Sequence, residues 1–68
     1  MLQFNLWQSQ ANKNWYFNMQ AANGEKVAQS EGYTSRQSAL NTINLIRREA
    51  ANAPINEHQN GRWVRLAA

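Results

Sequence analysis

Residues 19–40 read MQAANGEKVAQSEGYTSRQSAL and contain four structural signals in succession. They are the end of a strand, a tight turn, a returning strand and the start of a helix. Asn23-Gly24 predicts the turn, because a two-residue type I′ turn needs positive φ at both central positions and Asn-Gly tolerates this best. Residues 27–30 are then predicted to return as a strand, so this part of the chain forms a β-hairpin followed by a helix.

The predicted helix begins near Thr34 or Ser35. Thr34 and Gln37 fit a capping box, in which two side chains satisfy exposed backbone N–H groups of the first turn. Asn52 and Pro54 end the helix, because proline pushes its predecessor out of helical geometry. Between these limits one apolar stripe recurs at spacings of three and four, typical of an amphipathic helix, and contains Ala39, Leu40, Ile43, Ile46 and Ala50.

Further strands are predicted on both sides of this segment. Apolar and polar residues alternate over residues 2–6 and again over residues 15–21, which is the period of a half-buried strand. A polar loop over residues 8–14 connects them. After the helix, residues 55–61 are predicted to be a polar connector and residues 62–66 a short final strand.

These elements predict one α+β domain over residues 1–68, with a small antiparallel sheet, the element order β-β-β-α-β and the helix packed on one face. A chain of 68 residues buries only about 60% of its unfolded surface, and it has no Cys for disulfides. We therefore expect a homodimer, formed by edge pairing, face packing or strand exchange. Leu45, away from the apolar stripe, is a candidate contact. The expected centre of the core is Trp15, Phe17, Met19, Leu40, Ile43 and Ile46.

Residues 17–50 resemble the YegP-like family of short bacterial domains of unknown function. The shared pattern comprises Phe17, Met19, Ala21, Asn23-Gly24-Glu25, Val27, Ser30-Glu31, Tyr33, Ser35-Arg36, Thr42-Ile43 and Ile46. Thr42 stands where the family usually has Gly, and Arg36 where it has Lys. The resemblance implies a small unit of one sheet and one helix that often occurs twice in tandem. This chain looks like a single-repeat member, which is expected to pair with itself, and the resemblance implies no catalytic or binding residue.

The composition favours a folded, non-enzymatic, cytoplasmic protein. Apolar residues make up 43% of the chain and charged residues 16%, which is not the balance of a disordered chain. We find no signal-peptide pattern and no apolar run of about 18 residues that would span a membrane. Nucleophile elbows and phosphate loops are absent, and His58 has no Cys or Asp to join it. We expect no catalytic residues, no cofactor and no metal.

Three functional hypotheses stay open. The first is a homodimeric interaction module with an unidentified protein partner. The second is weak binding of single-stranded nucleic acid, because residues 1–35 carry two Lys and two Glu whereas residues 36–68 carry five Arg and two Glu; its candidate residues are Arg36, Arg47, Arg48, Arg62, Trp63 and Arg65. The third is a small-molecule sensor or accessory subunit, with Glu31 and Tyr33 at the dimer cleft. Each candidate also has a structural interpretation, in turns, at the helix dipole or in the core.

Overall fold

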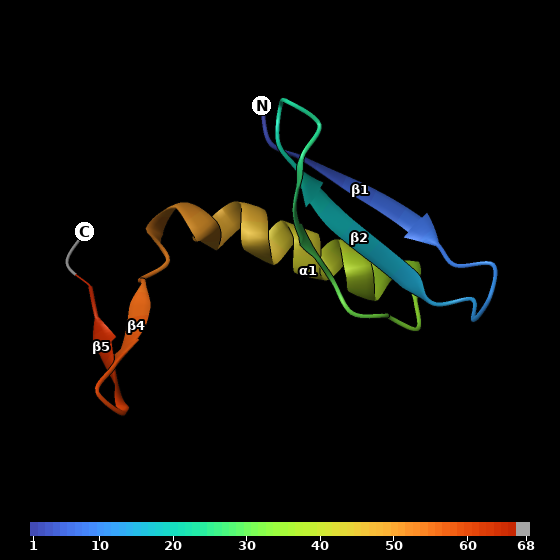
Figure 1. The fold of residues 1–68 in the computed structure, drawn as a ribbon. Coiled ribbons are helices and arrows are strands. Elements are labelled where there is room, and N and C mark those ends of the chain that lie inside the picture. The colour runs from blue at the N-terminus through green and yellow to red at the C-terminus, as the bar shows by residue number, and fades with distance from the viewer. Residues whose placement is uncertain (67–68) are drawn as a thin grey trace.

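The computed structural model describes residues 1–66 of the chain. A three-stranded sheet lies over one long helix, and a separate hairpin stands beyond the helix end (Figure 1). The predicted α+β class is confirmed. In chain order the elements are β1 (Gln3–Gln8), β2 (Trp15–Gln20), β3 (Lys26–Gln29), α1 (Arg36–Glu49), the 3-10 turn η1 (Ala50–Asn52), β4 (Asn56–Gln59) and β5 (Arg62–Arg65).

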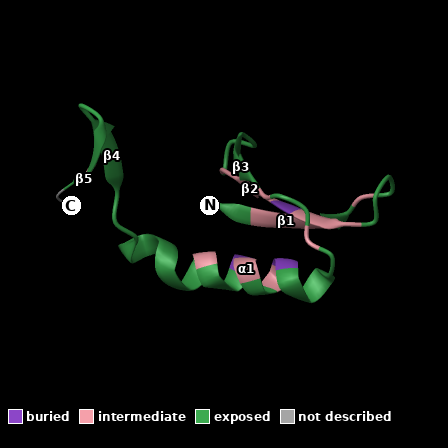
Figure 2. Ribbon diagram, turned by 90° about the horizontal axis from the view of Figure 1, so that it is seen from below, coloured by how far each residue is buried: buried purple, intermediate pink, exposed green. Residues whose placement is uncertain are grey.

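The sheet is antiparallel in the order β1-β2-β3, with Leu6 opposite Phe17 and Met19 opposite Ala28. Successive strand residues point to opposite faces. The faces of β1 and β2 that carry apolar residues therefore turn toward α1, which covers that side of the sheet only (Figure 2). The other face of the sheet is covered by no element of residues 1–66.

The core between sheet and helix is small. Within residues 1–66 its buried apolar side chains are those of Phe17, Ala39 and Ile43. Met19, predicted for the core centre, is half-buried and lies outside this cluster. The reason is that α1 contacts β1 and β2 but not β3, so the part of the sheet where Met19 pairs with β3 lacks a cover. The side chains packed around the cluster are Phe4, Leu6, Trp15, Tyr33, Leu40 and Ile46.

Both Asn-Gly pairs form hairpin turns, but of different kinds. At residues 23–24 the predicted type I′ turn is wrong: Gly24 has φ 88° whereas Asn23 is not in the positive region. Gly24 N–H donates to the Ala21 carbonyl over 2.9 Å, and the Asn23 side chain accepts from Glu25 N–H over 3.0 Å. The result is a three-residue loop that ends in a left-handed glycine. The Asn23 side chain accepts the hydrogen bond of a loop N–H group, and Asn23 itself keeps a negative φ.

The helix begins one residue later than its predicted cap. Ser35, not Thr34, is the N-cap, and its Oγ accepts from Ser38 N–H over 3.0 Å. The predicted capping box with Gln37 is therefore not formed. Because Ser35 is extended at φ −133° and ψ 151°, it has the backbone conformation that an N-cap requires. The helix continues into η1, and Pro54 follows, as the sequence predicted.

The C-terminal segment differs most from its prediction. Residues 56–59, predicted to be part of a connector, form β4, which pairs with β5 through Asn60 (φ 50°) and Gly61 (φ 82°). Positive φ at both positions is the requirement of a type I′ turn. The hairpin contacts no element of the sheet or α1. The radius of gyration is accordingly 14.9 Å, against about 11 Å for a compact domain of this length.

Candidate functional site

The five arginines do not form one surface. Arg36 is the first residue of α1, beneath the sheet, whereas Arg62 and Arg65 lie in β5 at the far end of the molecule (Figure 1). Arg47 and Arg48 occupy the last turn of α1, where cations favour the negative end of the helix dipole. Arg48 also lies 3.7 Å from the carboxylate of Glu49. Arg36 is thus separated from the other four arginines by the length of α1.

The hairpin brings Trp63 and Arg65 to one of its faces and places Arg62 on the other, because strand residues alternate. Trp63 is 72% exposed. Its ring meets the His58 ring edge-on, with centroids 5.2 Å apart. Arg65 Nε donates to Asn56 Oδ1 over 3.4 Å. The face that contains His58, Trp63 and Arg65 is therefore open, partly apolar and carries one arginine.

Tyr33 belongs to the core and not to a cleft. Its ring stacks on Phe17 with centroids 6.1 Å apart and planes 13° from parallel. Its backbone exchanges two hydrogen bonds of 2.7 and 2.8 Å with Trp15. Glu31 is exposed, and its side chain makes no hydrogen bond or ion pair within residues 1–66. Ser30 lies just beyond the end of β3 and still bonds to β2 through its side chain, since its Oγ accepts the Phe17 N–H over 2.9 Å.

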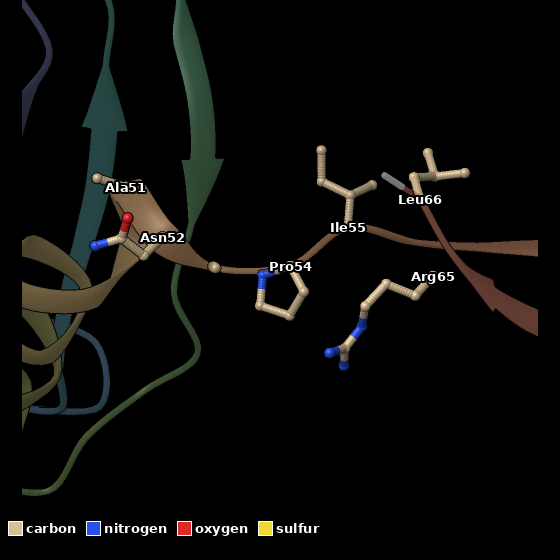
Figure 3. Close-up of a pocket in the computed structure, with 7 residues that line it drawn as sticks. Ala51, Asn52, Pro54, Ile55, Arg65 and Leu66 are labelled. Atoms are coloured by element: carbon tan, nitrogen blue, oxygen red, sulfur yellow. The ribbon is translucent and has the colours of Figure 1, made fainter. Parts of the chain in front are cut away.

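A hollow of about 370 Å³ lies where η1 meets the open end of the hairpin (Figure 3). Ile55 and Leu66 line it and are joined by a 2.8 Å hydrogen bond between Leu66 N–H and the Ile55 carbonyl. Arg65 extends back toward Pro54 in the same region (Figure 3). Neither Glu31 nor Tyr33 lines this hollow, so the two residues proposed for a sensor cleft are not joined by it.

The uncovered face of the sheet carries a row of amide side chains that the sequence analysis did not single out, beside two aromatic rings. Gln3 lies opposite Gln20, Asn5 opposite Asn18, and Trp7 opposite Tyr16. We call this set of six residues the amide face. The signal was present in the sequence, since alternation puts residues 3, 5 and 7 on the side opposite Phe4, but their pairing depends on the strand register.

The described part of the chain has no group of three or more His, Cys, Asp or Glu side chains placed to hold a metal ion. Among residues 1–66 there is also no helix with the length and apolar character needed to cross a membrane. Each remaining candidate is therefore an open surface: the hairpin face, the hollow beside it and the amide face.

Comparison with known proteins places this architecture in a family. Residues 10–57 match the family model described as "Domain of unknown function (DUF1508)". This chain belongs to the DUF1508 family. UPF0339 protein Atu0232 of Agrobacterium fabrum is 38% identical over 53 residues, which cover 78% of this chain and 84% of that protein. UPF0339 protein NMB1088 of Neisseria meningitidis serogroup B is 41% identical over 39 residues, covering 57% of this chain and 70% of that protein.

A solved structure shares the fold of this DUF1508 domain. The solution structure of a protein from Haloferax volcanii superposes with a TM-score of 0.71 at 28% identity. The match covers 84% of this chain and 95% of that one. The predicted resemblance to a small family of unknown function is thus confirmed, and the family assignment itself carries no catalytic residue to this chain.

Proposed function

We propose that this DUF1508 domain is a non-enzymatic interaction module that works as a homodimer, in which the β4–β5 hairpin of each copy docks on the other copy. The observation that carries the proposal is the isolation of the hairpin. It contacts neither the sheet nor α1. A lone two-stranded hairpin is marginally stable in water and needs a third strand or a helix to pack against.

The hairpin and its base expose the apolar side chains that such packing would bury. Trp63 is 72% exposed, Ile55 65% and Leu66 39%. Large aromatic residues at open surfaces are the usual anchors of protein interfaces. Because the core of a single copy buries only three apolar side chains within residues 1–66, a second copy would supply the apolar burial that one copy lacks.

The outer edge of β1 is the best acceptor for the hairpin. Both β1 and β3 are edges of the sheet, but they are protected differently. β3 is four residues long, carries Lys26 and has a register shift at its pairing with β2. β1 is six residues long and has neither charge nor proline, so it lacks the features that block strand addition. A two-fold arrangement would let each copy give one hairpin and receive one.

The same surfaces favour an interaction module over the two other hypotheses. Nucleic-acid binding draws its affinity from several clustered cations, and the arginines here are divided between α1 and β5. A sensor site at Glu31 and Tyr33 would need a cleft, whereas Tyr33 packs on Phe17. In support of the non-enzymatic assignment, the His58 ring contacts Trp63 on an open face, and within residues 1–66 no nucleophile or acid is hydrogen-bonded to it.

Isotope-filtered NMR on a mixture of labelled and unlabelled chains tests this arrangement. We expect intermolecular NOEs between the Trp63 ring and residues of β1. Trp63→Ala should weaken association by about 2 kcal/mol, roughly thirtyfold in dissociation constant. Arg62→Ala, on the opposite hairpin face, is the matched control and should change it little. NOEs from Trp63 confined to its own chain would overturn the proposal.

A further inference from the structure

We propose that the amide face binds a neutral polyhydroxylated ligand, an oligosaccharide. This site shares strand β1 with the proposed dimer contact, but it uses the face of the sheet opposite α1 (Figure 2), whereas the hairpin is proposed to dock on the outer edge of that strand. It is built from the outward-pointing residues of β1 and β2. These are Gln3, Asn5, Trp7, Tyr16, Asn18 and Gln20.

The amide side chains orient one another. Asn5 Nδ2 donates to Asn18 Oδ1 over 2.8 Å and to Gln20 Oε1 over 3.1 Å. Gln3 Nε2 donates to the same Gln20 oxygen over 3.0 Å, and Gln20 Nε2 donates to the Gly24 carbonyl over 2.9 Å. These hydrogen bonds favour one set of amide directions before any ligand arrives, which lowers the entropy lost on binding.

Unused hydrogen-bonding groups remain along this row. Within residues 1–66 the Asn18 Nδ2 donors and the Gln3 Oε1 acceptor have no side-chain or backbone partner. An amide presents both donors and an acceptor. A sugar hydroxyl also donates and accepts, so a row of amides matches a row of hydroxyls without requiring any charge on either side.

The aromatic pair extends the row with a flat apolar surface. The Trp7 and Tyr16 rings stack with centroids 6.0 Å apart and planes 21° from parallel. Asn12 Nδ2 donates to the Tyr16 hydroxyl over 2.8 Å. Gly32 lies under the tyrosine ring, where a Cβ would come within 3.1 Å of Tyr16 Oη. The pair is thus held from several sides, and the C–H face of a pyranose ring can pack on the exposed part of Trp7.

The absence of charge on the amide face favours a neutral ligand over an anionic one. None of its six residues is charged, and the adjoining Lys26, which pairs with Gln20, donates to Gln29 over 2.9 Å. A single-stranded nucleic acid could stack bases on Trp7, but its phosphates need several basic side chains beside the stacking platform. The arginines lie instead on α1 and β5. A neutral ligand therefore fits this face better than an anionic one.

The test is a titration of the full ¹⁵N-labelled chain with cellotetraose and, separately, chitotetraose at millimolar concentrations. We expect saturable shifts of the Trp7 indole and of the Asn5, Asn18 and Gln20 side-chain amides with at least one of the two. Trp7→Ala should weaken binding about tenfold. Trp63→Ala removes an exposed indole outside the face; compared with the parent at a concentration at which both chains are monomeric, it should leave this binding unchanged.

Three results would overturn the proposal. The first is the absence of saturable shifts with both oligosaccharides. The second is an equal loss of binding in Trp7→Ala and Trp63→Ala, which would place the site elsewhere. The third is a response of the same amide signals to oligo(dT) and not to either sugar, which would make the face a base-stacking platform. Because none of these readouts depends on dimer formation, failure here leaves the proposed homodimer untouched.

Discussion

Replacing Ile43 by alanine tests the small core on which the whole domain depends. Ile43 is 6% exposed and packs with Phe17 and Ala39 between α1 and the sheet. Truncating a buried isoleucine to alanine typically costs about 2–5 kcal/mol, because it removes buried methylenes and leaves a cavity. A domain of this size has a total stability of roughly 3–10 kcal/mol. We therefore expect Ile43→Ala to lower the free energy of unfolding by about 3 kcal/mol, a large share of the total.

Urea denaturation followed by far-ultraviolet circular dichroism measures this loss at a fixed chain concentration, since association would itself shift the midpoint. Leu45→Ala is the matched control: it removes a similar apolar group from the same helix at a side chain that is 45% exposed. We expect the control to cost about 1 kcal/mol or less. Ile43→Asp should abolish folding, because it buries an unpaired charge.

Equal losses in Ile43→Ala and Leu45→Ala would refute the assignment of the core, since they would mean that the two sides of α1 are equally buried. A cooperative transition at the normal midpoint for Ile43→Asp would refute it more directly. If Leu45→Ala weakened association and left the unfolding of the separated chain unchanged, Leu45 would be a dimer contact and the core assignment would stand.

Three further substitutions test local features, each by thermal unfolding against the parent chain. Gly32→Ala places a Cβ 3.0 Å from Asn14 Nδ2 and 3.1 Å from Tyr16 Oη, and should destabilise by about 1–3 kcal/mol; an unchanged melting temperature would show that the ring yields freely. Ser30→Ala removes the acceptor of the Phe17 N–H and should cost about 1–3 kcal/mol, with a neutral result contradicting that bond. Ser35→Ala should cost about 1 kcal/mol, whereas the same change at Thr34 should cost less.

The helix and the three-stranded sheet could be predicted because their burial leaves a period in the sequence. The stripe through Ala39 and Ile43 recurs with the helical period because one face of α1 meets the sheet. Residues 56–59 carry no apolar side chain at all, and the hairpin that they open buries no face within its own chain. A strand without a buried face shows no alternation of apolar and polar residues, and for this reason the sequence predicted a connector where β4 forms.

The turn at residues 23–24 shows a second limit of sequence reasoning. The pair Asn-Gly occurs at two hairpins, β2–β3 and β4–β5, yet both of its residues are left-handed only at Asn60 and Gly61. At Asn23 the side chain instead accepts a hydrogen bond from Glu25 N–H, and the loop is one residue longer. Which of the two turn conformations an Asn-Gly pair adopts depends on the length of the loop. The register of the flanking strands sets that length, so the dipeptide alone does not predict the conformation.

Which residues share a candidate surface could be predicted from the sequence even less well than the turns, because it depends on the tertiary structure. The clustering of arginines in the second half of the sequence suggested one basic surface. Arg36 instead begins α1, whereas Arg47 and Arg48 lie at its end and the other two lie in the hairpin beyond that end (Figure 1). Conversely, Gln3 and Gln20 are far apart in sequence and become partners only through the β1–β2 register. The order of residues along the chain therefore predicted a basic surface that is not formed as one patch, and it gave no indication of the amide face.

Sedimentation equilibrium of the full chain over a range of micromolar concentrations tests the central claim, that the isolated β4–β5 hairpin is completed by a second copy. The chain mass is 7.8 kDa. The proposed homodimer predicts a limiting mass of twice this value that falls toward the monomer on dilution, with Trp63→Ala shifting the transition to higher concentration. A mass that stays at 7.8 kDa at every concentration would contradict the account.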